Sequence, residues 1–296
     1  MEISQEIVQE KLSRREMTQN QNSFNVKSNY KYNIVWKNVI SLTYLHFGGL
    51  YALFLLFRDN EVNRYTIIWC KYKHFNLFYC LTCIVAQRTT YHFPVVGILS
   101  SMGVTAGAHR LWCHRSYKAK WPLRLYLMIS QTLSMQNHIY EWVRDHRVHH
   151  KFTDTDADPH NARRGFFFSH VGWLMVRKHP DVIKKGATVD MSDLEKDPIV
   201  VFQRRWYYIL VLLVCFVIPV GVPYYFWNEQ FILCWNGNLT RYIYTLNVTW
   251  LVNSAAHIWG MKPYDVNIQP TENLIVPILA CDEKWHNLIV NDLNIE

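Results

Sequence analysis

Seven of the fourteen histidines fall into spaced groups whose side chains could bind metal. The densest region is "VRDHRVHHKFTDTDADPHN", residues 143–161, in a chain that is otherwise half hydrophobic. The groups are His109 with His114, then His146 with His149 and His150, then Asn253 with His257, and finally the single His286. Any one group would fit a set of surface histidines, but together they predict a metal site.

The spacing within two of these groups brings the side chains to one face of a helix. On an α-helix of about 3.6 residues per turn, His146, His149 and His150 share a face. Asn253 and His257, four residues apart, do the same. Each group therefore predicts a helix that presents its donors on a single side.

The remaining pair and the chemistry of imidazole indicate the kind of centre. His109 and His114 lie about 140° apart around an α-helix, so both reach one metal cluster only if the helix bends or ends between them. Neutral imidazole suits iron, zinc, copper or nickel. Zinc prefers four ligands, so a set of seven or more fits two metal ions better. Nearby carboxylates could orient the ring nitrogens: Glu141, Asp145, Asp154, Asp156 and Asp158.

Apolar segments long enough to cross a bilayer separate these groups. The chain has 296 residues, 15% of them aromatic, and its mean hydropathy of −0.09 reflects a division between very apolar and very polar stretches. A span takes roughly 20 apolar residues, which places spans near 39–57, 93–111, 206–227 and 231–252. We expect an all-α integral membrane protein, with four transmembrane helices and a cytosolic helical cap that holds a His-rich di-metal site. Residues 1–33 are expected to be a disordered polar tail, and residues 34–296 one membrane domain.

Basic residues orient these spans. Seventeen of the 31 Lys and Arg residues lie between Arg110 and Arg205, which predicts that this segment, the metal site and both termini are cytosolic. The net charge of +8 would also suit nucleic acid, but the basic segment lies between spans and carries no nucleic-acid motif, so no nucleic-acid partner is expected. A soluble helical protein is the other alternative, and the apolar run at 206–227 argues against it. A di-iron centre at a membrane surface would suit dioxygen activation against a C–H bond of a lipid chain.

Four long stretches carry a family resemblance. "GVTAGAHRLWCHRSYKAKWPLR", "QNHIYEWVRDHRVHHKFTDTDADPHNARRGFFFSHVGWLMVRKHP", "VDMSDLEKDPIVVFQ" and "TWLVNSAAHIWGMKPYD" closely resemble the membrane acyl-CoA desaturases of animals, of the stearoyl-CoA desaturase type and most like the insect branch. The resemblance covers about residues 34–288. It implies an oxidoreductase of the endoplasmic reticulum membrane, which uses O2 and two iron ions to place a double bond in a fatty acyl-CoA.

The resemblance also implies roles for individual residues. The iron ligands would be His109, His114, His146, His149, His150, His257 and His286, with Asn253 acting through water. Contacts to the acyl-CoA would come from Asn38, Asn137, Arg144, Asp145, Arg177, Lys178 and Trp250. Of these, Arg144, Arg177 and Lys178 could pair with phosphates. Membrane lipid would surround the spans, and electrons would come from cytochrome b5 and its reductase.

The last histidine box departs from the family pattern. The family reads H-N-x-H-H there, whereas this chain reads "HNLIV", with Ile289 and Val290 where two ligands stand in the family. Neither side chain can coordinate iron, so seven of nine expected histidines remain. The alternative is therefore a catalytically impaired or inactive desaturase homologue, a truncated isoform that retains acyl-CoA binding only.

Overall fold

The computed structural model describes residues 32–59, 88–263, 271–273 and 275–280. Contacts divide the chain into two units, residues 1–33 and 34–296, and the elements below belong to the second. The described part of this unit is helical, and its pairings outside helices are two isolated bridges, Ile34 to Val176 and Met261 to Glu272. The expected all-α class is thus confirmed for the described residues.

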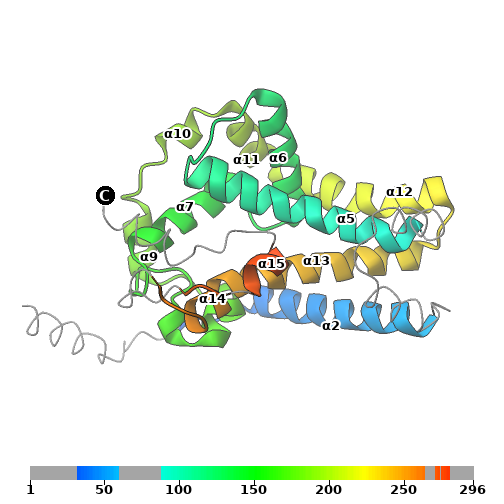
Figure 1. The fold of residues 1–296 in the computed structure, drawn as a ribbon, viewed down its shortest axis with the longest axis horizontal. Coiled ribbons are helices and arrows are strands. Elements are labelled where there is room, and N and C mark those ends of the chain that lie inside the picture. Colours follow the sequence, from blue (N-terminus) through cyan, green and yellow to red (C-terminus); the bar gives the residue numbers. More distant parts are fainter. Residues whose placement is uncertain (1–31, 60–87, 264–270, 274, 281–296) are drawn as a thin grey trace, which may run out of the picture. The chain divides into compact units, whose positions relative to one another are not determined.

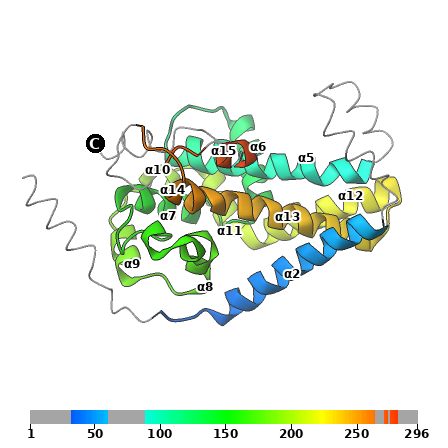
Figure 2. The same ribbon diagram turned by 60° about the horizontal axis from the view of Figure 1, so that its bottom comes forward.

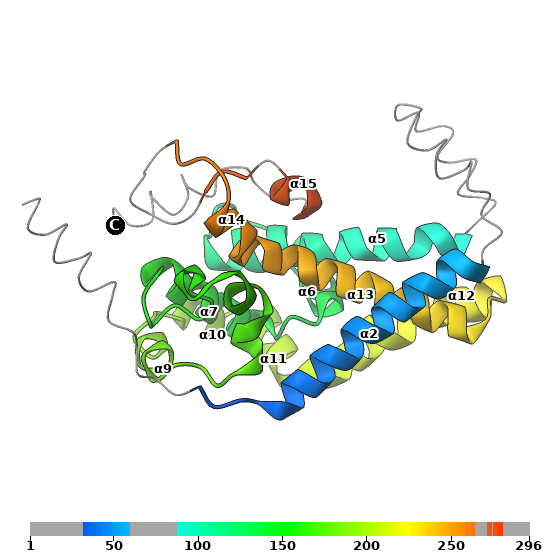
Figure 3. The same ribbon diagram turned by 90° about the horizontal axis from the view of Figure 1, so that it is seen from below.

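The long helices run alongside one another (Figures 1 and 3). They are α2 (Trp36–Asp59), α5 (Arg88–Met102) with its continuation η1 (Gly103–Cys113), α11 (Pro198–Val211) with η4 (Leu212–Val217) and α12 (Ile218–Trp227), and α13 (Phe231–Asn253). Helix α13 packs against α2, α5 and α12. Each of the four predicted spans therefore falls on a helix.

One of these helices has the length and composition of a membrane span. Among the described residues, only the continuous helix Pro198–Trp227 satisfies both criteria, with a mean hydropathy of 2.4 over its most apolar window. Asp197 caps its start by accepting from the backbone N–H groups of Ile199 and Val200. Its outward face is apolar, and the Tyr208 side chain is 87% exposed. The crossing of the other three helices remains a prediction.

Shorter helices gather at one end of the long ones (Figure 2). They are α6 (Trp121–Ser134), α7 (Ile139–Lys151), η2 (Ala162–Arg164), η3 (Phe168–Gly172), α8 (Trp173–Met175), α9 (Pro180–Gly186), α10 (Ser192–Glu195), α14 (Ala255–Ile258) and α15 (Val276–Ala280). A core of apolar side chains from η1, α6, α7, α10 and α11 lies among them, including Trp112, Leu127, Val143, Leu194 and Val200. This core supports the helices that carry the histidines.

Close backbone contact sets the position of η1 against α6. A Cβ atom on Gly103 would lie 2.1 Å from the backbone nitrogen of Gln131 and 2.2 Å from the carbonyl carbon of Ser130. Only glycine fits at such a distance. Gly103 therefore allows the first turn of η1 to contact the backbone of α6 directly.

Candidate metal centre beside an apolar cavity

The end of η1 brings His109 and His114 together. This segment is π-helical, and the His114 N–H donates to the His109 carbonyl five residues back at 2.9 Å. The wider turn places the later ring over the earlier one, with ring centroids 4.5 Å apart. The helix ends at Cys113. The requirement that the helix bend or end between these histidines is thus met by a local change of helix type.

Helix α7 brings the next group of histidines to the same place. Its N-terminal residue Ile139 donates its backbone N–H to Gln203 Oε1 at 2.9 Å, and the His138 ring accepts from the Glu141 N–H at 3.1 Å. These bonds satisfy two N–H groups of the first turn. The predicted shared face of His146, His149 and His150 is present: the Nε2 atoms of His146 and His150 lie 2.9 Å apart, and the His149 ring lies beside both but belongs to a second cluster.

Four imidazoles form the first cluster. Each offers one ring nitrogen, and the four nitrogens lie within 4.8 Å of one another: His109, His114, His146 and His150. Burial lowers the pKa of His114 to about 3, with smaller contributions from His109 and Arg147. Burial, together with the neighbouring His150, also lowers the pKa of His146 well below its usual value. Both rings are neutral at pH 7, the state that binds a metal ion.

Arg147 fixes the orientation of α7 without entering this cluster. Its guanidinium donates to both carboxylate oxygens of Asp193, at 3.0 and 2.8 Å, and to the Trp112 carbonyl at 2.8 Å. The arginine therefore ties α7 to α10 and to η1. Because the neighbouring residue is His146, this attachment also holds the donor face of the helix in place.

The second cluster contains His149, Asp158 and His160, which offer ligand atoms within 4.8 Å of one another. The ring of His257 lies close by, with its centroid 5.1 Å from that of His149. His149 Nδ1–H donates to Asp158 Oδ1 at 2.9 Å, and both side chains are only 1% exposed. Within the described residues, Nε2 of His149 is buried and has no hydrogen-bond partner, so it could bind a metal ion.

The loop after α7 holds Asp158 in place. Its Oδ2 accepts from the Asp154 N–H and its Oδ1 from the His160 N–H, both at 3.1 Å. Asp154 has a positive φ of 64°, a conformation that asparagine and aspartate tolerate better than most residues. Burial alone would raise the pKa of Asp158, but His149 and these donors lower it, so the carboxylate is ionised.

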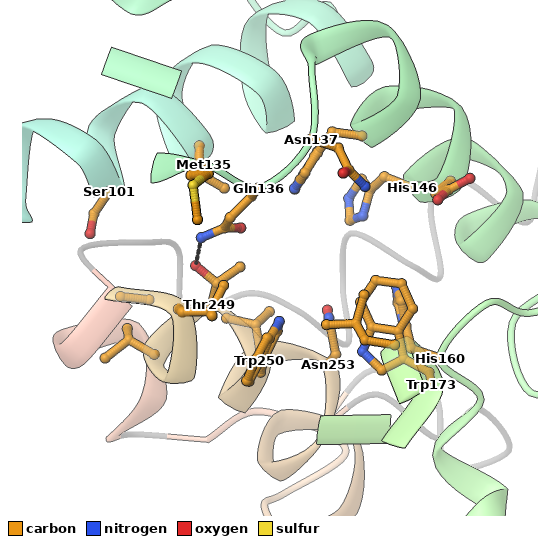
Figure 4. Close-up of a pocket in the computed structure, with 18 of the residues that line it drawn as sticks. Ser101, Met135, Gln136, Asn137, His146, His160, Trp173, Thr249, Trp250 and Asn253 are labelled. Carbon is orange, nitrogen blue, oxygen red and sulfur yellow. Dashed lines mark hydrogen bonds between the residues drawn. The ribbon is translucent and has the colours of Figure 1, made fainter. Parts of the chain in front are cut away.

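A cavity of about 310 Å³ adjoins both clusters, within the usual range for ligand pockets. His146 and His160 lie at one end of it with Asn253 and Trp173, and Ser101 and Met135 lie at the other (Figure 4). Its wall is largely apolar and includes Leu42, Leu45, Val104, Leu174, Tyr242, Leu246 and Trp250. Gln136 Nε2 donates to Thr249 Oγ1 across it at 2.9 Å (Figure 4).

Two histidines hold the cavity-lining Trp250. The His46 ring stacks on it at 6.0 Å between centroids, and the His170 ring meets it edge-on at 5.7 Å. Asn247 joins the two histidines, with its Nδ2 3.2 Å from His46 Nε2 and its Oδ1 3.1 Å from His170 Nε2. A continuous polar chain thus links α2, α13 and η3 and keeps the indole in the wall.

The expected acyl-CoA contacts divide between the cavity and its surroundings. Asn38, Asn137, Asp145 and Trp250 line the cavity. Asp145 also forms ion pairs with Arg144, at 3.0 Å, and with Lys178. Arg177 is exposed. Arg144 and Lys178 therefore contact a cavity-lining residue without lining the cavity themselves.

The structure also shows what the spacing argument missed. His160 belongs to the second cluster although no helical spacing relates it to His149. The feature of the sequence that could have indicated this histidine is the run "DADPH", in which it closely follows a carboxylate. Asn253 lines the cavity, and its expected action on the metal through water stays a prediction. His286, Ile289 and Val290 lie outside the described residues.

Imidazole clusters held by η1, α7, α14 and the loop after α7, beside an apolar cavity, form a donor set that could bind metal in a helical protein. A fatty acid desaturase family model matches residues 89–295, and the chain belongs to the fatty acid desaturase family.

Named relatives agree with this assignment. The chain is 54% identical over 259 residues to an acyl-CoA Delta-9 desaturase of Acheta domesticus, with 87% of this chain and 65% of the relative covered. It is 53% identical to an acyl-CoA Delta12-desaturase of the same species, with 87% of this chain and 66% of the relative covered. It is 49% identical to the stearoyl-CoA desaturase of Homo sapiens, with 87% of this chain and 65% of the relative covered. The chain thus spans just under two thirds of the length of these relatives.

Proposed function

We propose that this protein is an acyl-CoA desaturase that introduces a double bond into the chain of a fatty acyl-CoA. The observation that carries the proposal is that members of both histidine clusters, His146 and His160, line one largely apolar cavity (Figure 4). An apolar wall accommodates an alkyl chain, and adjacent imidazoles can hold a metal next to one of its C–H bonds. The acyl-CoA Delta-9 desaturase and stearoyl-CoA desaturase relatives support the same activity.

The donor set supports iron as the metal. Buried, neutral imidazoles with free nitrogens suit iron, and Nε2 of both His114 and His149 is buried without a hydrogen bond. His109, His114, His146 and His150 would hold one ion. His149, His257 and His286 would hold the other, with Asn253 acting through water. Iron bound there would supply the dioxygen chemistry, and cytochrome b5 with its reductase would supply the electrons.

The other residues would bind and orient the substrate. The apolar wall excludes water from the alkyl chain, and Trp250, held by its two histidines, fixes the path of that chain. Asn38, Asn137 and Asp145 would contact the substrate along the cavity. Arg144, Arg177 and Lys178 would pair with the CoA phosphates, and Arg144 and Lys178 would then exchange part of their contact with Asp145.

The proposed setting is the endoplasmic reticulum membrane. The apolar outer faces of α2 and of the helix Pro198–Trp227 support contact with lipid, because exposed apolar side chains such as Ile40, Phe47 and Phe226 line them. We propose four spans, with the metal centre and both termini cytosolic. Residues 34–296 would form the membrane domain, and residues 1–33 a separate tail.

Ile289 and Val290 favour a second candidate, a homologue that retains acyl-CoA binding but turns over poorly. Expression in a desaturase-deficient yeast, with gas chromatography of total fatty acids, separates the two. Monounsaturated product from the unmodified chain, lost in His149→Ala, supports the desaturase.

Product that appears only after Ile289→His with Val290→His and addition of a relative's C-terminal segment supports the impaired homologue. In that case the unmodified chain should still bind stearoyl-CoA. Absence of both product and acyl-CoA binding in every variant would overturn the proposal.

A further inference from the structure

His160 lies in the wall between His149 and the cavity. It is 5% exposed, and its ring centroid is 4.2 Å from that of His149 and 5.5 Å from that of Trp173. Its backbone N–H is fixed by the bond to Asp158. The ring therefore occupies one place, with His149 on one side and the cavity on the other.

The His160 ring has a buried nitrogen that makes no hydrogen bond within the described residues. This atom is Nδ1, which lies in ion-pair range of Asp158 Oδ1, at 3.7 Å. Such an atom in a native structure calls for an explanation, and an ion is one of them.

The distances suit a shared metal ion. Ligand nitrogens lie about 2.1 Å from a bound first-row metal, so two donors on opposite sides of it are about 4.2 Å apart. The donors of His149, Asp158 and His160 lie within 4.8 Å of one another. A shift of a few tenths of an ångström in each side chain closes the difference.

The second metal position also lacks donors. The proposed function assigns His149, His257 and His286 to it, while Ile289 and Val290 stand where the family has two more histidines. Among the described residues, four histidine rings lie next to that of His149: His146, His150, His160 and His257. Of these, His160 is the one to which the resemblance gives no role.

We propose that His160 is a ligand of the metal ion held by His149 and His257, and that Asp158 orients His149 for the same ion. The inference rests on the proposed iron centre and adds a donor to it. Because His160 also lines the cavity, its ligation holds the ion at the cavity wall, next to the alkyl chain.

The test measures iron(II) per purified full-length chain by plasma mass spectrometry after anaerobic loading. Wild type is expected to hold two ions, and His160→Ala one, which halves the iron content. His160→Gln, which keeps most of the side-chain volume, should lose the same ion if ligation and not packing is responsible. His179→Ala serves as the control, because His179 lies at the start of α9, outside both clusters. It should retain both ions.

Chemical rescue distinguishes a ligand from a packing residue. Added imidazole should restore the second ion to His160→Ala, because the truncated side chain opens into the cavity, but it should not restore it to His160→Gln. Two ions in a folded His160→Ala would overturn the role of His160 alone, whereas no iron in wild type would overturn the proposed iron centre itself.

Discussion

Replacing Asp158 by asparagine tests how the second cluster is oriented. The carboxylate accepts three hydrogen bonds, from His149 Nδ1 and from the N–H groups of Asp154 and His160. Asparagine keeps the shape but offers one oxygen in place of two. If that oxygen faces His149, the amide NH2 must face the Asp154 N–H, so two donors oppose one another.

The magnitude follows from these contacts. A hydrogen bond to a charged partner contributes about 1.5–3 kcal/mol, against about 1 kcal/mol for a neutral one. The site is only 1% exposed, so solvent does not screen the loss. Loss of a carboxylate that orients a histidine ligand typically lowers metal affinity about 10–100-fold, which is about 1.4–2.8 kcal/mol. We expect Asp158→Asn to weaken one of the two ions by this factor.

Chelator competition on the iron-loaded protein measures the effect. Wild type should release iron in two steps, and Asp158→Asn should shift only the step that belongs to the second cluster. Asp156→Asn is the matched control, because Asp156 lies in the same loop but pairs with Arg164, at 2.5 Å. A release curve for folded Asp158→Asn that coincides with wild type would refute the orienting role of the carboxylate.

Three further outcomes are expected. Gly103→Ala should lower the thermal unfolding midpoint, because the new Cβ would lie 2.1 Å from a backbone nitrogen of α6. Such an overlap costs at least about 1–3 kcal/mol. Gly48→Ala is the control and should have little effect, because its Cβ would meet only a side-chain atom at 3.8 Å. Burial opposes ionisation of Asp193, but the Arg147 hydrogen bonds lower its pKa below the unfolded value. The stabilisation that ionised Asp193 gives the folded state is therefore present at neutral pH and lost as the pH falls through the lowered folded pKa. Asp193→Asn should therefore make the stability, measured by circular dichroism, depend less on pH in the acid range. A Ser116→Cys probe, at an exposed position, should be labelled from the cytosolic side of sealed microsomes; labelling from the lumen alone would contradict the proposed topology.

Much of the fold could be predicted from hydrophobic run length. The four apolar stretches coincide with α2, with α5 and η1, with the helix Pro198–Trp227 and with α13, because about 20 apolar residues between turn signals favour a helix in any apolar environment. Helix boundaries were less predictable. The helix at 206–227 begins at Pro198, where the Asp197 cap, and not the apolar run, determines its start.

The candidate site was predictable only where its donors share one regular helix. His146, His149 and His150 follow from α-helical spacing, whereas His109 and His114 required a π-helical segment that spacing alone does not reveal. His160 was missed because a loop brings it to His149, and the carboxylate that folds this loop, Asp158, acts through backbone N–H groups. Tertiary contacts of this kind leave no periodic signal in a sequence.

The π-helical end of η1 makes the number of residues between His109 and His114 as important as their identity. In an α-helix each residue advances the chain by about 100°, so inserting one residue between the two histidines would leave them six apart and on opposite sides of a regular helix. Neither histidine would be changed, yet the pair could no longer meet at one ion. An insertion here should therefore be as damaging as replacement of a ligand, whereas conservative substitutions of the intervening apolar side chains should be tolerated.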